Sequence, residues 1–160
     1  MWFLLRRTLL VVLVVCMPLS VCARDVGYGP FFKVLGVTQE QDRLVLPLTR
    51  GKYANVRILD GKTYRWLLSC TETLCQQPDA KGNIEVQSVR GAQTRPGMWI
   101  AQVAVDQRWL LTFLVFQNPK GYGVVAPDTI VITQPSWYER LEQEVTGQVD
   151  RFVKEGNDAM

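Results

Sequence analysis

Apolar and polar residues alternate over short stretches through most of the chain, in the region Phe31–Ile132. In RLVLPL, Leu44, Leu46 and Leu48 share one face, because successive side chains of a strand point to opposite sides. Pro47 places this stretch at a sheet edge, since proline cannot donate a ladder hydrogen bond. Similar stretches separated by turn residues predict about seven or eight strands in all. We expect an antiparallel β-sandwich or a partly closed barrel.

Two pairs of these stretches are separated by short turn sequences. Asp60-Gly61 lies between NVRIL and KTYRWLL and predicts a tight hairpin. A second hairpin is expected to turn at Asp106-Gln107. Its later arm, Trp109–Phe116, is apolar on both faces except at Thr112, which predicts a central strand covered on both sides. The segments NIEVQSV and GVVAPDTIVITQP supply further strands.

The pattern changes to helical spacing after Pro135. Ser136 and Glu139 match a capping box at the start of a helix. Lys154 in the last turn and Gly156 two residues later predict its end. Gly147 lowers the stability of the middle of this helix by about 1 kcal/mol relative to alanine. The apolar positions form one stripe of Trp137, Leu141, Val145, Val149 and Phe152. We expect a helix that packs on this protein's own sheet, and docking into the groove of a partner is the alternative.

The N-terminal segment has the pattern of a secretory signal peptide. Arg6 and Arg7 precede an apolar run, and the segment ends in VCA, a suitable exit for signal peptidase. We expect cleavage between Ala23 and Arg24. The apolar run is shorter than the roughly 20 residues that a spanning helix needs, which disfavours a retained anchor. Acylation of Cys22 is the alternative, and only this route predicts contact with a membrane.

A single domain remains after the expected cleavage, with a β-rich part at 24–134 and the helical part at 135–160. The leader removes two of the 18 basic residues and none of the 15 acidic ones, which leaves 16 against 15. A nearly neutral chain has no electrostatic footprint for nucleic acid. No Asn-x-Ser/Thr sequon occurs. Together with the leader, this favours the periplasm of a bacterium with two membranes, or secretion.

Several kinds of chemistry lack their residues in this chain. There is no histidine, which excludes Ser-His-Asp and Cys-His nucleophile systems and removes the commonest transition-metal ligand. TRGKYAN does not have the spacing of a phosphate-binding loop. A hydrolase that uses two carboxylates stays open, although no spacing singles out a pair. We expect a protein that is not an enzyme and that holds no cofactor or metal.

Cys70 and Cys75 are the two cysteines that remain after the expected cleavage. A zinc site normally needs four ligands, and thiol-disulfide catalysts use Cys-x-x-Cys at a helix start. In an oxidising compartment the pair predicts a disulfide, which is expected to contribute about 2 kcal/mol because its loop is small. It would hold TETL as an exposed loop after the TYRWLLS strand. The candidate interaction residues of this loop are Glu72, Thr73, Leu74 and Asp79.

Aromatic residues also occur in three turn-like sequences that contain glycine. GYG occurs at 27–29 and 121–123, and TRPGMW at 94–99. Paired turn chemistry is the first interpretation. The alternative is a contact surface, because tyrosine, tryptophan and arginine are enriched in binding hot spots. Its members would be Tyr28, Arg95, Trp99 and Tyr122.

These patterns favour an exported protein that binds another protein and does no catalysis. We expect a periplasmic subunit of a bacterial envelope assembly of the secretion, conjugation or pilus type. The alternative is an inhibitor or immunity-type protein that blocks a secreted enzyme with the loop from Cys70 to Asn83. A weaker alternative is a carrier whose apolar strands enclose a small apolar ligand.

Overall fold

Ten strands and two helices make up the part of the chain that the computed structural model describes, residues 23–48, 55–93 and 95–156. The expected signal peptide lies outside this part except for its last residue, Ala23, so nothing described bears on Cys22. The strands are β1 (Arg24–Tyr28), β2 (Phe32–Glu40), β3 (Arg43–Val45), β4 (Val56–Ile58), β5 (Leu74–Gln77), β6 (Ile84–Gly91), β7 (Met98–Val105), β8 (Trp109–Asn118), β9 (Gly121–Val125) and β10 (Ile130–Ile132). The helices are α1 (Gly61–Ser69) and α2 (Pro135–Lys154).

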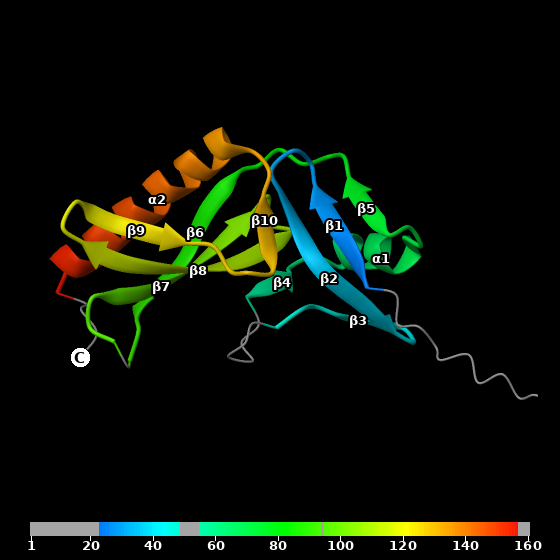
Figure 1. The fold of residues 1–160 in the computed structure, drawn as a ribbon, viewed down its shortest axis with the longest axis horizontal. Coiled ribbons are helices and arrows are strands. Elements are labelled where there is room, and N and C mark those ends of the chain that lie inside the picture. The colour runs from blue at the N-terminus through cyan, green and yellow to red at the C-terminus, as the bar shows by residue number, and fades with distance from the viewer. Residues whose placement is uncertain (1–22, 49–54, 94, 157–160) are drawn as a thin grey trace, which may run out of the picture.

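The strands form two sheets. The first has the order β10-β2-β1-β5, with β3 also paired to β2, and the second has the order β4-β8-β7-β6, with β9 also paired to β8. Every pair is antiparallel except β1 with β5, which is parallel. The arrangement is sandwich-like and is not a closed barrel, so the expected fold class is confirmed, although the described residues form ten strands and not seven or eight. In Figure 1 the first sheet lies on the right, and the second lies on the left beneath α2.

The hairpin expected at Asp60-Gly61 is wrong, because a helix begins there. The Asp60 carboxylate accepts a hydrogen bond from the backbone N–H of Thr63 at 3.2 Å and so caps α1. Thr63 and Leu67, four residues apart, are both buried on one face of that helix. An Asp-Gly pair serves a hairpin turn and a helix start equally well, and burial at helical spacing decides between them here. Cys70 consequently caps the end of α1 and does not end a strand.

The hairpin at Asp106-Gln107 is confirmed. Both residues have positive φ (51° and 55°), as in a type I′ turn, and the Arg108 N–H donates to the Val105 carbonyl at 3.0 Å. Strand β8 is central, since it pairs with β7 on one side and with β4 and then β9 on the other. The expectation that both of its faces are covered is wrong for its second half, where Leu114 and Phe116 are exposed.

The expected edge strand with Pro47 is β3, which pairs only with β2 and ends just before the proline. Leu44 and Leu46 pack against the core as the alternation predicts. Leu48 is exposed, so the shared face does not extend past Pro47.

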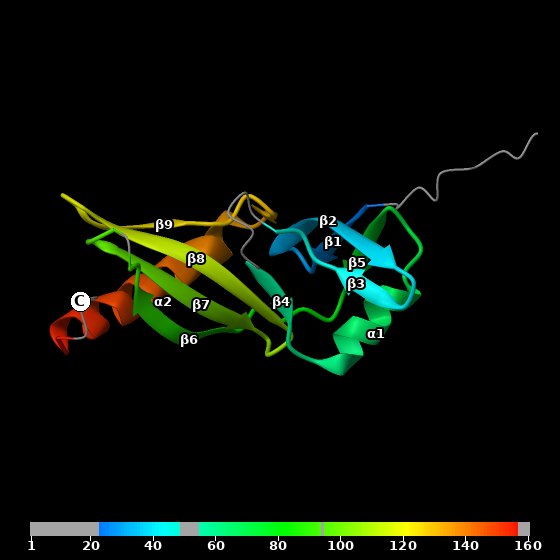
Figure 2. The same cartoon turned by 90° about the horizontal axis from the view of Figure 1, so that it is seen from below.

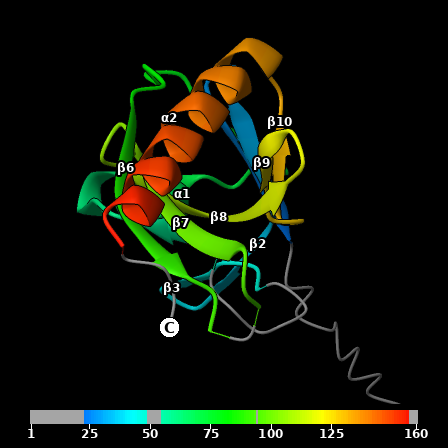
Figure 3. The same cartoon turned by 90° about the vertical axis from the view of Figure 1, so that its left-hand side faces the viewer.

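Helix α2 packs on the second sheet, across β6, β7 and β9, as seen from its end in Figure 3. Its stripe faces inward: Phe152 is partly buried, and the other four members have no exposed surface, namely Trp137, Leu141, Val145 and Val149. The stripe of this helix is therefore part of the protein's own core.

The start of α2 differs from the expected capping box. The helix begins at Pro135, and its N-cap is Gln134, which makes no side-chain capping bond. Proline suits the first helical position because its fixed φ is helical and its missing N–H would have no partner there. Ser136 is consequently already inside the helix and cannot cap it.

Four aromatic rings join the two sheets and α2 in one core. Phe32 of the first sheet stacks on Trp137 of α2 with ring centroids 5.7 Å apart, and both Phe32 and Tyr28 meet Trp109 of the second sheet edge-on, at 6.2 and 6.3 Å. The two buried indole N–H groups also have acceptors. Trp137 donates to the Gly82 carbonyl at 2.9 Å and Trp109 to the Gln77 side chain at 3.4 Å.

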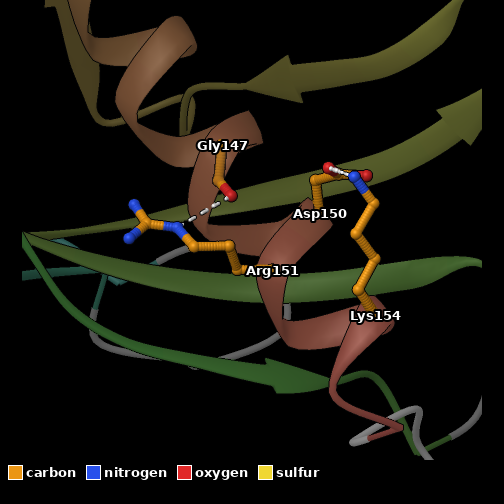
Figure 4. A network of polar contacts seen from close by, with 4 residues as sticks. All are labelled: Gly147, Asp150, Arg151 and Lys154. Atoms are coloured by element: carbon orange, nitrogen blue, oxygen red, sulfur yellow. Dashed lines mark hydrogen bonds and ion pairs between the residues drawn. The ribbon is translucent and has the colours of Figure 1, made fainter.

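The outward side of the last turns of α2 is polar (Figure 4). Lys154 forms an ion pair with Asp150 at 2.7 Å, and Arg151 donates to the Gly147 carbonyl at 3.5 Å. The helix ends at Lys154, and Gly156, two residues later, has a φ of 73° and donates its N–H to the Val153 carbonyl.

Two glycines of this segment provide a matched stability test. A Cβ would meet nothing within 4 Å at either Gly147 or Gly156, but only Gly156 has a positive φ. Gly147→Ala should therefore raise the free energy of unfolding by about 0.5–1 kcal/mol, because alanine is the better helix former. Gly156→Ala should lower it by about 1 kcal/mol, because it forces a left-handed alanine. Urea unfolding followed by circular dichroism measures both, and a loss of stability in Gly147→Ala would contradict the helix packing.

Candidate interaction surface

The second sheet has apolar side chains on both faces, and α2 covers only one of them. Along β7 and β8 the residues that face α2 alternate with residues that face away. The register pairs Met98 with Phe116, Ile100 with Leu114, and Leu114 with Val125 of β9. These five side chains therefore share the side opposite α2. We call them the outer apolar face: Met98, Ile100, Leu114, Phe116 and Val125.

The outer apolar face is open to solvent. Leu114, Phe116 and Val125 are 43%, 37% and 48% exposed, and Met98 and Ile100 are partly exposed. Figure 2 looks onto this side of the sheet, with α2 behind it and no other helix or labelled strand in front. Single exposed apolar residues are ordinary, whereas neighbours on three adjacent strands form a patch of the kind that marks binding sites.

Gly123 gives Phe116 its place in this patch. The two residues are cross-strand partners, and the aromatic ring occupies the space that a Cβ at Gly123 would need. The ring therefore lies across β9. The neighbouring Tyr122 points to the other side of the sheet and meets Trp99 edge-on at 5.5 Å. In the second GYG sequence, Gly123 therefore lies on the outer side beneath Phe116, and Tyr122 packs on the core side.

Arginines lie beside the outer apolar face. Arg90 of β6 pairs with Ile100, and Arg57 of β4 pairs with Leu110, so both lie on the same side of the sheet as the patch. Both are exposed, and Lys154–Asp150 is the only ion pair within the described ranges. Glu85 of β6 pairs with Ala104 and so also lies on this side, and it accepts a hydrogen bond from Gln107.

The disulfide expected between Cys70 and Cys75 is present. It joins the end of α1 to β5, where Cys75 is buried opposite Val26 of β1. Glu72, Thr73 and Leu74 are exposed between the two cysteines. The Thr73 carbonyl also accepts the N–H of Asp25 at 2.9 Å, which ties the short loop to β1 as well.

The rest of the expected loop, up to Asn83, is held against the domain. Gln77 is buried, and Gly82 is buried beneath Phe31, where a Cβ would lie 2.6 Å from the ring. Asp79 is exposed, and its carbonyl accepts a hydrogen bond from the Arg108 side chain at 3.4 Å.

A carboxylate of the β7–β8 turn fixes this segment. Asp106 accepts hydrogen bonds from the backbone N–H groups of Lys81, Gly82 and Asn83 at 2.8, 2.9 and 2.7 Å, and a fourth from the Tyr28 hydroxyl. We call this arrangement the Asp106 clamp. Burial by itself raises the pKa of the Asp106 carboxyl, but the four donors together hold that pKa below its ordinary value. Burial, and then the bond to Asp106, raise the pKa of Tyr28 well above its ordinary value.

An open cleft of about 470 Å³ lies beside the clamp. The residues that line it are polar or charged except Ile84, namely Asp79, Lys81, Asn83, Glu85, Asp106, Gln107 and Arg108. Asp106 already accepts from four donors and has a lowered pKa, so it is a poor base. No group of three potential metal-ligating side chains occurs in the described part of the chain.

The alternative contact surface of Tyr28, Arg95, Trp99 and Tyr122 does not form. Tyr28 and Trp99 are buried in the core, at 0% and 5% exposure, and Tyr122 is partly buried against Trp99. Only Arg95 is exposed. The outer apolar face was missed, although it left a signal, since Trp109–Phe116 is apolar on both faces.

The Asp106 clamp predicts a pH-dependent stability. Since the folded-state pKa of Asp106 lies below the ordinary value of 3.8, its contribution is present above about pH 4 and is lost as the pH falls through the folded value. Asp106→Asn, which tolerates the positive φ, should lower the free energy of unfolding by about 2 kcal/mol at pH 7. Denaturant melts at pH 7 and pH 3 should show this difference shrinking in acid. The exposed Asp42→Asn is the control, and equal effects of the two variants would contradict the clamp.

The comparisons with known proteins assign this chain to no family. No family model, no curated protein and no solved structure matches it. The fold, the outer apolar face and the clamped loop are therefore the observations from which its function is argued.

Proposed function

We propose that this protein is exported, does no catalysis, and binds another protein as a periplasmic subunit of a bacterial envelope assembly of the secretion, conjugation or pilus type. The observation that carries the proposal is the outer apolar face. Burying such a surface against a partner is favourable by roughly 25 cal/mol for each Å² of apolar area. A sheet that had to face only water on this side would carry polar residues at these positions.

The compartment is supported by two observations. The disulfide between Cys70 and Cys75 suits an oxidising environment, and the N-terminal sequence has the pattern of a cleaved leader. Neither described helix is long and apolar enough to cross a membrane. Arg24, the residue after the expected cleavage site, already pairs with Val37 in the first sheet.

The interior supports binding at the surface over binding in a cavity. Aromatic rings lie where the two sheets meet α2, and the cleft beside the Asp106 clamp is open and lined mainly by polar and charged residues. A carrier of a small apolar ligand needs an apolar hollow, so these observations do not favour that alternative.

The exposed tip Glu72–Leu74 favours a second candidate function. The disulfide and the bond from Asp25 brace this tip, and Leu74 is 41% exposed. A loop whose conformation is already fixed loses little entropy on binding, as an inhibitor of a secreted enzyme requires. The tip is small, and the segment that follows it is clamped to the domain, so the outer apolar face is the stronger candidate.

Charge placed on the outer apolar face tests the first proposal. Leu114→Glu should release the protein from a large complex in the native envelope, because the carboxylate cannot be buried against an apolar partner. Native gel electrophoresis of gently solubilised envelopes measures the shift. Val131→Glu is the matched control, since Val131 is equally exposed at 42% but lies on β10 of the first sheet.

The two variants should have equal thermal stability, so that release reports on binding alone. If Leu114→Glu stays in the large complex, or if wild type is never part of one, the proposal is wrong. Truncation of α2 does not provide this test, because its stripe is core and its loss unfolds the domain.

Substitution at the tip tests the second candidate. The double change Glu72→Ala and Thr73→Ala removes exposed side chains and leaves both cysteines in place. If the protein is an inhibitor, the change should weaken its complex with the target enzyme by at least about tenfold, measured by titration against secreted hydrolases of the same organism. If the double variant inhibits as well as wild type, the tip Glu72–Leu74 is not the inhibitory loop.

A further inference from the structure

The size and charge of the outer apolar face define the kind of partner that fits it. We propose that it receives one amphipathic α-helix of a partner protein, and that this helix carries acidic residues along its flanks. The inference rests on the proposed function and names the partner segment.

The dimensions of the patch suit a single helix. Its five side chains lie on three adjacent strands, which span roughly 10 Å at the usual strand spacing, and successive same-side rows are roughly 7 Å apart along a strand. A helix with its side chains is about 10–12 Å wide. Interfaces between whole folded domains use about 20–30 residues on each side, far more than this patch offers.

The opposite face of the same sheet already binds a helix. There α2 packs across β6, β7 and β9, and Leu141 and Val145 of its apolar stripe are fully buried. On β7 and β8 each outward apolar residue directly follows an inward one: Ile100 follows Trp99, and Leu114 follows Phe113. A partner helix on the outer side would therefore cover the second face of the sheet as α2 covers the first.

The charges beside the patch determine the flanks of that helix. Arg90 borders the row Ile100–Leu114–Val125, and Arg57 lies two rows further along the sheet. A helix laid across the strands would partly desolvate Arg90, which is favourable only if a carboxylate faces it. Glutamate or aspartate at the edge of the helical stripe meets this requirement.

A second copy of this chain does not supply such a helix. The stripe of α2 is already buried, and the outward residues of α2 are polar, among them Glu139, Arg140 and Glu144. The stripe of α1 is also turned inward, with Thr63 and Leu67 buried. Neither described helix can therefore present an apolar stripe to another copy without unfolding its own core.

The partner segment is identified by crosslinking from a neighbouring position. Thr112 lies on the same side of β8, one row from Leu114, and is replaced by the photocrosslinker p-benzoylphenylalanine in the full chain, expressed in its own host. Mass spectrometry then identifies the crosslinked peptide. We expect a segment with apolar residues at helical spacing and with acidic flanks, which is afterwards synthesised as a peptide.

Affinities of this peptide for three forms of the mature protein complete the test. Arg90→Glu should weaken binding about tenfold, and a peptide with lysine in place of its flanking acids should bind Arg90→Glu better than wild type. Arg140→Glu, a matched charge reversal on the exposed side of α2, should leave the affinity unchanged.

Four outcomes would overturn the inference: a crosslink to a second copy, a crosslink to lipid, a partner segment that is extended or basic, or equal binding by Arg90→Glu and wild type. An extended or basic segment of another protein would leave the proposed function intact, because Leu114→Glu tests that function without reference to the shape or charge of the partner. If Thr112 crosslinks to nothing while Leu114→Glu does not change the complex, both proposals fail.

Discussion

The carboxylate of Asp106 holds together parts of the chain that are far apart in sequence. It sits at the turn between β7 and β8, yet its four donors come from β1 and from the segment 81–83. The segment between β5 and β6 has backbone N–H groups with no partner in either sheet, and such groups need an acceptor. The Asp106 carboxylate accepts from three of them. The first sheet, the crossing segment and the second sheet are thereby held in one arrangement, on which the aromatic core between them depends.

That arrangement gives the second sheet two unequal faces. One face meets α2 and the aromatic rings of the first sheet, and its central side chains on β7 and β8 are buried. The other face carries the outer apolar face beside Arg57 and Arg90, with no described helix to cover it. Apolar exposure of this kind is tolerated when a partner relieves it. The proposed function and the proposed helix both follow from this inequality of the two faces.

Errors at the level of sequence arose where a local signal had two meanings. Asp60-Gly61 suits a turn and also a helix start, and only the burial of Thr63 and Leu67 on one side favours the helix. Ser136 and Glu139 match a capping box, but Pro135 already occupies the first helical position. Tyr28 and Trp99 are residue types common in interfaces and in cores alike. The β7–β8 hairpin was predicted correctly, because its two apolar arms and the turn residues between them agree.

The sequence by itself determined the features that depend on neighbours along the chain. These are the β-rich class, the hairpin at Asp106-Gln107, the α2 stripe and the pairing of Cys70 with Cys75, each carried by period, turn chemistry or the number of cysteines. Only the tertiary structure decided which apolar residues stay in water. Leu114 and Leu111 look alike in sequence, yet one is exposed and the other buried, because α2 and the first sheet cover the side of β8 that carries Leu111, whereas the other side is open at Leu114. Burial is a property of what packs against a residue, and the local pattern does not encode it.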